Sequence, residues 1–385
     1  INNEVSRMHN SQDVATYCKN RSRMFAQKLV LSYPVGKGML KIGEEYISSM
    51  ANNHFYTEYT GLNNAVSKIK ENNIACFVEM MQQIGKFSLG AGLRYEHVNY
   101  NYLKNAYSWD NLCRTYNNVF PSLNVDTRLG KVQMSLSYSS RVERPTYSNL
   151  NANVSYLNRM TYESGNPRLQ ATILHSLEYM VVWKNYFSHV AYSYFDNPIM
   201  NTTKPYSDTG EITLLTYENF KKKHFLQAFV GGQFKVGVWQ PRVSMGIFTQ
   251  WFNILVNDKD KSMNNPIGIL QWQNAIQLPL DFWLNIDGQW TTSGYDRNIH
   301  LRSSSYVNAK LYKDFSKKKL SITLEARDIF NGSRSDFTVY NNAVTMFQRN
   351  FSEMRCVMFT FQYNFNVTHD RYRGTGAGNT EKKRF

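Results

Sequence analysis

The sequence predicts an all-β protein, a transmembrane antiparallel up-and-down β-barrel of about fifteen strands. Segments in which apolar and polar residues alternate recur along the 385 residues, and this period of two is that of a β-strand. Short turns and long loops join these segments in alternation. Aromatic residues make up 15% of the chain, yet no apolar run approaches the ~18 residues that would indicate a spanning helix.

The hairpin over residues 73–96 shows the alternation most clearly. One face of its second strand is apolar with a terminal tyrosine: Phe87, Leu89, Ala91, Leu93 and Tyr95. The opposite face is small, polar and charged, and it ends with Arg94 and Glu96. We expect the apolar face to meet lipid, the polar face to line the lumen, and Tyr95 to lie in the outer aromatic girdle. Ile84–Lys86 is then a periplasmic turn.

The first half of the chain supplies strands that alternation and turn residues delimit. Pro34 and Gly38 provide a tight turn, and Lys184 with Asn185 a two-residue turn. Polar connections are expected over 57–72 and 103–115, and the longest loop, rich in Asn, Tyr, Pro and Arg, over 142–170. The predicted strands are 22–33, 39–56, 73–84, 87–96, 116–126, 132–141, 172–183 and 186–196.

The second half continues the pattern. The segment 212–234 is too long for the membrane alone, so its first half is expected to project beyond the bilayer. Turns are expected over 237–241, over 278–281 and at the basic stretch before Leu320, and a loop over 330–350. The predicted strands are 212–234, 242–254, 269–277, 282–292, 306–313, 320–328 and 354–365.

The order of short and long connections separates a membrane barrel from a soluble sandwich. A sandwich has no reason to place every short turn at one end, whereas an outer-membrane barrel has tight periplasmic turns and long external loops. Bacterial single-chain barrels have an even strand number, and Ile1 begins no signal-peptide pattern. We therefore expect the later part of a larger barrel, with the wall over 1–365 and a polar periplasmic tail over 366–385.

The net charge of +15 leaves several partners open. Basic runs at 221–223, 317–319 and 382–384 lie at predicted strand ends or in the tail, where solvated charges or contacts with outer-membrane lipid and lipopolysaccharide explain them. Nucleic acid is the weakest candidate, because the aromatic residues follow the strands and do not cluster beside these runs. The four cysteines have no metal-type spacing and are interpreted as packing residues.

The sequence offers no catalytic or metal-binding constellation. The histidines are scattered over different predicted strands and loops, and no G-x-S-x-G turn is present. The acidic residues lack the spacing of a calcium-binding loop. We therefore expect no enzyme activity, no cofactor and no metal site.

Four short motifs carry a resemblance to a known family. GLRYE at 92–96, FPSLN at 120–124, RPTYSNLN at 144–151 and YESGNPRL at 162–169 follow one another along the chain. In this order they resemble the outer-membrane β-barrel family of Bacteroidetes-type bacteria, which are relatives of TonB-dependent transporters. The resemblance covers nearly the whole chain.

The resemblance implies a 22-stranded barrel in the bacterial outer membrane, with an N-terminal plug domain. It also implies a TonB-type energy-transducing partner and an unknown nutrient ligand. Neither the plug nor its TonB box is found in this sequence. The expected function is TonB-dependent uptake of a large nutrient. The alternatives are a structural or adhesive surface barrel without transport and, third, a soluble all-β binding protein.

Two groups of residues are candidates for the functional site. Loop candidates for substrate contact are Arg144, Tyr147, Asn151, Tyr162, Glu163, Asn166, Tyr107 and Trp109. The alternative for these loops is structural: Gly165–Pro167 sets a turn, and Tyr147 packs the loop against the wall. Candidates that face the lumen or the plug are Glu79, Arg94, Glu96, Asp126, Arg141, Glu178, Glu325 and Arg327. These charges would form ion pairs or hold the plug, or else they would contact substrate or tune ion selectivity.

Overall fold

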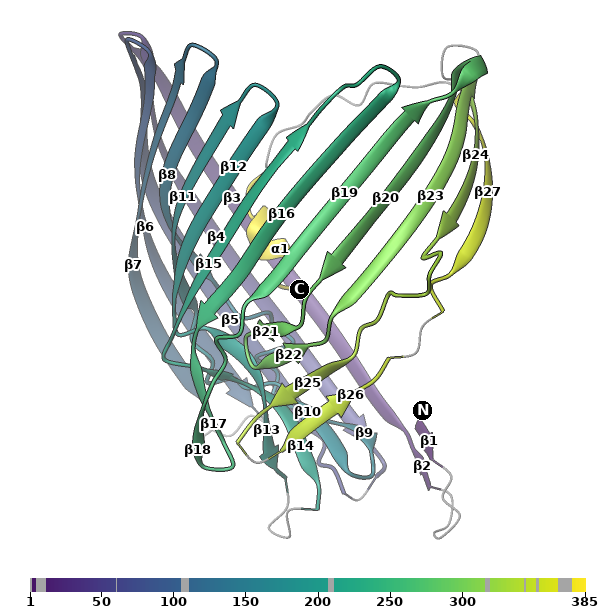
Figure 1. Ribbon diagram of the computed structural model, residues 1–385. Coiled ribbons are helices and arrows are strands. Elements are labelled where there is room, and N and C mark those ends of the chain that lie inside the picture. The colour runs from purple at the N-terminus through teal and green to yellow at the C-terminus, as the bar shows by residue number, and fades with distance from the viewer. Residues whose placement is uncertain are drawn as a thin grey trace.

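The computed structural model consists almost entirely of one large antiparallel sheet (Figure 1). It describes residues 2–4, 12–59, 61–104, 111–206, 211–315, 319–342, 344–350, 353–365 and 376–385. The sheet has 15 strands. They are β3 (Thr16–Val35), β4 (Gly38–Thr57), β5 (Ala65–Ile84), β6 (Phe87–Lys104), β7 (Leu112–Leu129), β8 (Val132–Glu143), β11 (Thr172–Trp183), β12 (Tyr186–Asp196), β15 (Lys222–Gln233), β16 (Trp239–Trp251), β19 (Ile267–Gln277), β20 (Phe282–Thr291), β23 (Ser304–Phe315), β24 (Leu320–Arg327) and β27 (Cys356–Tyr363).

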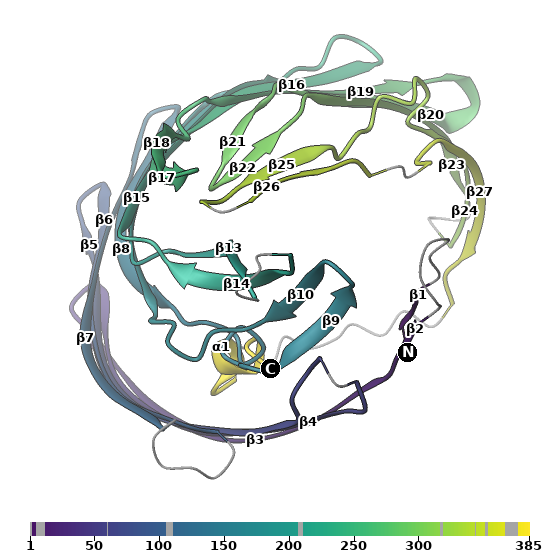
Figure 2. The same cartoon turned by 90° about the horizontal axis from the view of Figure 1, so that it is seen from below.

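The sheet curls around a central space (Figure 2). Each strand pairs with its neighbours in chain order, from β3 at one edge to β27 at the other. The two edge strands are not paired with each other among the described residues, so the sheet is an open barrel wall. The predicted fold class, an antiparallel up-and-down arrangement of about fifteen strands, is confirmed.

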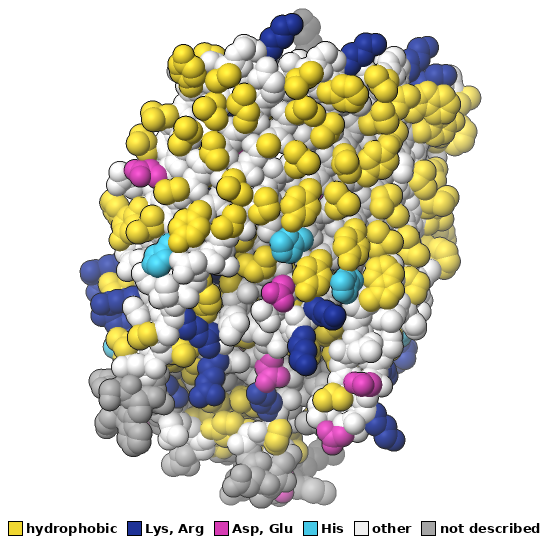
Figure 3. Space-filling model, turned by 90° about the vertical axis from the view of Figure 1, so that its left-hand side faces the viewer, with side chains coloured by type: hydrophobic (Ala, Val, Ile, Leu, Met, Phe, Trp, Pro, Cys, Tyr) yellow, Lys and Arg dark blue, Asp and Glu magenta, His cyan; other side chains and the backbone are white. Residues whose placement is uncertain are grey.

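The register gives the sheet two different faces. Leu123 of β7 lies opposite Tyr138 of β8, which lies opposite Leu177 of β11, so apolar side chains line up in rows across the strands. Leu123 is 50% exposed and Leu177 46% exposed on this outer face. Figure 3 shows a broad hydrophobic band there, with lysines and arginines at the upper rim and below the band. This is the outer surface that a lipid-facing barrel requires.

Short turns lie together at one end of the sheet (Figure 1). Gly36, Gly85 and Gly130 occupy these turns with φ of 57°, 58° and 61°. A left-handed backbone favours glycine, and at Gly85 an added Cβ would meet nothing within 4 Å, so the backbone conformation alone accounts for this residue. The predicted turns at Ile84–Lys86 and Lys184–Asn185 are confirmed.

The long connections at the other end form small sheets of their own. One contains β13 (Ile199–Pro205), β14 (Thr213–Asn219), β10 (Thr161–Ser164) and β9 (Val154–Asn158). Another contains β21 (Gly294–Asp296), β22 (Ile299–Leu301), β25 (Phe337–Tyr340) and β26 (Thr345–Gln348). Two-stranded sheets join β17 (Asn253–Val256) to β18 (Lys259–Ser262) and β1 (Asn2–Glu4) to β2 (Gln12–Val14). In Figure 2 both four-stranded sheets cross the space enclosed by the wall.

Several predicted boundaries are wrong. β6 and β7 extend into the expected connection over 103–115, and β16 begins within the expected turn over 237–241. The expected connection over 57–72 contains the start of β5 at Ala65, because inward side chains such as Ser67 and Glu71 are polar there and the hydropathy alternation disappears. The expected single strand over 212–234 is β14 followed by β15. Asn219 marks the break, and its Nδ2 donates to the carbonyl oxygens of Gln170 and Asn197.

The cysteines and the tail also differ from expectation. All four cysteines are free and exposed, so the predicted packing role is wrong. Of the expected polar periplasmic tail over 366–385, residues 366–375 lie outside the described residues, and residues 376–385 lie on the inner side of the sheet (Figures 1 and 2). We call residues 376–385 the C-terminal hook, which contains the short helix α1 (Asn379–Lys382). In the described part of the chain no helix is long and apolar enough to cross a membrane.

The two faces predict different costs for the same substitution at two neighbouring positions. Leu136→Arg puts a charge on the outward face of β8, where an arginine at mid-membrane costs about 2–4 kcal/mol in the free energy of unfolding. Ser137→Arg, one residue along, faces inward and should cost much less. Urea titrations of both variants folded into liposomes measure the difference. Equal losses at the two positions would contradict the assigned faces.

Candidate functional site on the inner wall

The loop motif, residues 144–151, packs against the inner face of the wall. Tyr147, Leu150 and Leu169 are buried there beside wall residues from β5 and β6. These wall residues are Ile69, Tyr100 and Tyr102. Because all six side chains are at most 7% exposed, the long loop is anchored to the wall by an apolar cluster.

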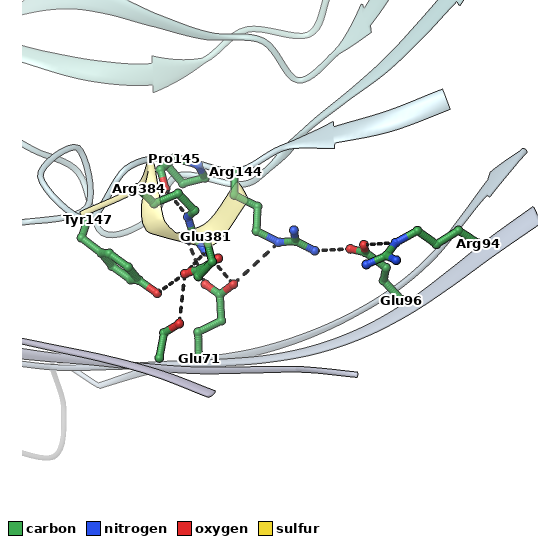
Figure 4. A network of polar contacts seen from close by, with 9 residues as sticks. Glu71, Arg94, Glu96, Arg144, Pro145, Tyr147, Glu381 and Arg384 are labelled. Atoms are coloured by element: carbon green, nitrogen blue, oxygen red, sulfur yellow. Dashed lines mark hydrogen bonds and ion pairs between the residues drawn. The ribbon is translucent and has the colours of Figure 1, made fainter. Parts of the chain in front are cut away.

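A chain of alternating charges runs along the same wall (Figure 4). We call it the lumenal ion network, and its members are Glu45, Arg94, Glu96, Arg144, Glu71, Arg384 and Glu381. Arg94 lies 3.0 Å from Glu45 and 2.6 Å from Glu96. Arg144 of the loop motif pairs with Glu96 and lies 3.7 Å from Glu71. Each charge therefore has at least one opposite neighbour, as charges removed from water require.

The C-terminal hook completes this network from the far end of the sequence. Arg384 makes two hydrogen bonds to Glu71, of 2.7 and 3.0 Å, and its Nη1 lies 2.8 Å from Glu381. Its Nε donates to the carbonyl oxygen of Pro145 at 3.0 Å. Burial alone would lower the pKa of Arg384, but Glu71 and Glu381 raise it well above its ordinary value. The guanidinium is thus a permanent positive charge between wall, loop motif and hook.

Tyr147 of the loop motif makes several contacts with the hook. Its backbone N–H donates to the carbonyl oxygen of Arg384 at 3.0 Å, and its hydroxyl donates to Glu381 at 2.6 Å. The ring of Phe385 lies 4.8 Å from the Tyr147 ring, and the Arg384 guanidinium lies 4.7 Å from it. Burial raises the pKa of Tyr147 far above its ordinary value, so the phenol stays protonated and donates.

The predicted loop residues are only partly brought together. Arg144 belongs to the lumenal ion network, and Tyr147 donates a hydrogen bond to its member Glu381. Asn151 accepts a 3.4 Å hydrogen bond from Ser67 of β5. Tyr162 is buried in a separate cluster with Tyr156 and Phe55. Of the other four loop candidates, two lie outside both of these groups of contacts: Glu163 lines a cavity, and the Nδ2 of Asn166 donates to the Tyr217 carbonyl oxygen at 2.9 Å. Tyr107 and Trp109 lie outside the described residues.

The predicted lumenal charges all lie on the strand face opposite to the apolar one. Arg94 and Glu96 are in the network, and Glu79 lines a cavity beside them. The others make local contacts on other strands: Asp126 with Asn124 at 3.1 Å, Arg141 with Glu143 at 3.8 Å, Glu178 with His189 at 3.6 Å, and Glu325 with Arg327 at 2.8 Å.

Four members of the lumenal ion network were not predicted from the sequence: Glu45, Glu71, Glu381 and Arg384. Glu71 lies an even number of residues from Asn73 and Ala75, so alternation alone would have placed its side chain on the inner face. It was not identified because residues 57–72 were expected to be a loop and β5 begins at Ala65.

The hook forms part of the lining of two cavities. A cavity of about 760 Å³ is lined by Lys28, Lys41, Glu79, Arg94 and the hook residue Ala377. A second, of about 290 Å³, lies under the loop motif and is lined by Asn53, Asn151, Asn153, Tyr217 and the hook residue Phe385. Among the described residues no group of His, Cys, Asp and Glu is arranged to hold a metal ion. Amides, paired charges and tyrosines equip this face to bind polar ligands.

Removal of Arg144 tests whether the network holds the loop motif. Its side chain is 14% exposed, so Arg144→Ala should leave Glu96 partly uncompensated and cost about 3–5 kcal/mol. Arg141→Ala is the control, because Arg141 is 62% exposed and its partner lies 3.8 Å away. Hydrogen exchange of residues 144–151, followed by mass spectrometry, should become faster only in Arg144→Ala. Similar exchange in both variants would speak against an anchoring role.

Solved structures resemble the chain in fold. A copper transporter, OprC, matches with a TM-score of 0.65 at 9% identity over 91% of this chain and 58% of its own. The haemophore receptor HasR of Serratia marcescens matches with a TM-score of 0.61 at 11% identity over 91% of this chain and 60% of its own. The ferric yersiniabactin uptake receptor FyuA of Yersinia pestis matches with a TM-score of 0.63 at 10% identity over 92% and 56%. The chain thus spans less than two thirds of these proteins, and no curated protein matches it.

The sequence itself matches a family model. The model is described as the outer membrane protein beta-barrel family, and the match covers residues 1–363. The expected resemblance to an outer-membrane barrel family, and with it the location in the bacterial outer membrane, is confirmed. The chain belongs to the outer membrane protein beta-barrel family.

Proposed function

We propose that this chain forms the wall of an outer-membrane receptor that takes up a large nutrient ligand. The observation that carries the proposal is the contrast between the faces: an apolar outer band and an inner wall with two polar cavities and paired charges. A purely structural or adhesive barrel has no need of polar cavities along its inside. The names of the structural neighbours, a copper transporter and a ferric yersiniabactin uptake receptor, support the same class of function.

The energy for uptake is proposed to come from a TonB-type complex that acts through a plug domain of the complete protein. Lys41, Glu79 and Arg94 line the larger cavity and would offer charges of both signs to such a plug. No catalytic step is assigned, since the inner wall offers binding groups and no activated nucleophile is identified among its described residues.

The ligand is proposed to enter through the smaller cavity under the loop motif. Asn151 and Glu163 line this cavity, and Glu163 is exposed. Around the wall, the apolar band would contact the hydrocarbon of the membrane. Exposed basic residues beyond it on β3, Lys19, Arg21 and Arg23, would contact the phosphates of lipopolysaccharide.

Energy-dependent uptake is the central test. A strain that lacks the gene and the complemented strain are incubated with three probes, a ferric siderophore, haem and a copper chelate. We expect at least one probe to accumulate only in the complemented strain, and a protonophore to stop its accumulation. If all three probes accumulate equally in both strains while surface attachment differs, the adhesive alternative is favoured and the uptake proposal fails.

A single loop substitution tests the proposed ligand entry. Glu163→Gln removes a charge from the smaller cavity and should weaken uptake of the accepted probe by about tenfold, the equivalent of one charge-assisted hydrogen bond. Glu353→Gln is the control, since Glu353 is 64% exposed and pairs only loosely with Arg355. Concentration dependence of uptake separates the two variants. An unchanged affinity in Glu163→Gln would remove this cavity from the entry path.

A further inference from the structure

The C-terminal hook is docked as a specific ligand would be. Two of its side chains, Glu381 and Arg384, are buried, whereas Lys382 and Lys383 between them are exposed. The buried pair contacts three different parts of the molecule: Ser49 of β4, Glu71 of β5 and Tyr147 of the loop motif. These contacts join residues that lie more than 200 positions apart in the sequence, so local chain geometry does not impose them.

Backbone geometry adds a second requirement. Gly378 has a φ of +69°, and its N–H donates to Glu45 at 3.2 Å. A Cβ at this position would come within 2.8 Å of the Ala26 side chain and 3.1 Å of Met24 on β3. Only glycine combines this conformation with this approach to the wall. The hook is therefore recognised at Gly378, Glu381, Arg384 and Phe385.

From these contacts we infer that the inner wall carries a docking site whose ligand is the chain's own C-terminal segment. The site fits a segment with a glycine, an acidic residue, an arginine three positions after the acidic residue and an aromatic residue directly after the arginine. Once docked, the hook holds the loop motif against the wall through Pro145 and Tyr147. Ala377 lines the larger cavity and Phe385 the smaller one, so the docked hook forms part of the lining of both cavities. This inference does not rest on the proposed uptake function.

Recognition is tested with full-length variants and a synthetic peptide of residues 376–385. Arg384→Ala in the chain should undock its own hook and free the site, so the fluorescein-labelled natural peptide should bind this variant at least tenfold more tightly than the unaltered chain. A peptide with Lys383→Ala should bind as well as the natural one, and a peptide with Arg384→Ala at least tenfold less. Heat-modifiable gel mobility confirms that the variant barrel is folded.

Exchange of the charges at positions 71 and 384 distinguishes a loss of recognition from a folding defect of a single variant. Glu71→Arg in the chain should reject the natural peptide, and a peptide with Arg384→Glu should bind it again. Failure of the natural peptide to bind the folded Arg384→Ala chain, or equal binding of all peptides, overturns the inference. Gly378→Ala in the full chain should speed hydrogen exchange of residues 144–151, whereas Lys383→Ala should not. Unchanged exchange in Gly378→Ala would show that the hook does not hold the loop motif.

The docking should also depend on acid pH. Burial alone would raise the pKa of Glu381, but Arg384 and the hydrogen bonds from Tyr147 and Ser49 lower it below its ordinary value of 4.5. The nearby charges on other elements are Glu71, which shares Arg384 with Glu381, and Arg144, which lies 3.7 Å from Glu71. Glu45 on the wall accepts a hydrogen bond from the N–H of Gly378 in the same hook. Because the docked pKa is lowered, the stabilisation is complete above about pH 4.5 and is lost as the pH falls through the docked value. Peptide binding measured from pH 7 to pH 3 should therefore stay constant and then weaken, and a loss between pH 7 and 5 would contradict this assignment.

Discussion

The backbone hydrogen bonds of the wall are the constraint on which the rest of this structure depends. In hydrocarbon an unpaired N–H or C=O group costs several kcal/mol, so a membrane-spanning segment must satisfy its backbone within the protein. Here each interior strand of the 15-stranded sheet has an antiparallel neighbour on both sides, in unbroken registers such as that of β11 with β8. Once the ladder is continuous, successive side chains must point alternately outward and inward. The apolar outer band and the polar inner wall both follow from this pairing.

The charges on the polar inner wall are partly removed from water, and the lumenal ion network supplies the opposite charges that stabilise them. Charges removed from bulk water are stable only when opposite charges and hydrogen-bond donors surround them. Glu71 and Glu96 face inward on neighbouring strands, and the loop motif supplies Arg144 between them. The hook supplies Arg384. The same interactions that neutralise the wall therefore fix the loop motif and the C-terminus in place.

This arrangement changes the role expected of the loop motif. Tyr147 and Leu150 are buried against the wall, so this part of the loop is an inner lining of the barrel. This agrees with the structural alternative for the loop, in which Tyr147 packs against the wall. Amides and the exposed Glu163 around the smaller cavity remain accessible to a ligand. Anchoring and binding are thus divided between neighbouring residues of one long connection.

The sequence by itself determined the order of the wall strands, the assignment of their two faces, most of the short turns and the family, because a period of two and the turn residues are local properties. The two hairpin strands over 172–183 and 186–196 were predicted with their observed limits. It also identified Arg94, Glu96, Arg144 and Tyr147 as members of a candidate site. Only the tertiary structure decided that β5 begins at Ala65, that 212–234 breaks at Asn219, and that Glu71 meets Arg384. The physical reason is that a polar strand end is indistinguishable from a loop in hydropathy, and that an ion pair 313 positions apart leaves no periodic trace in the sequence.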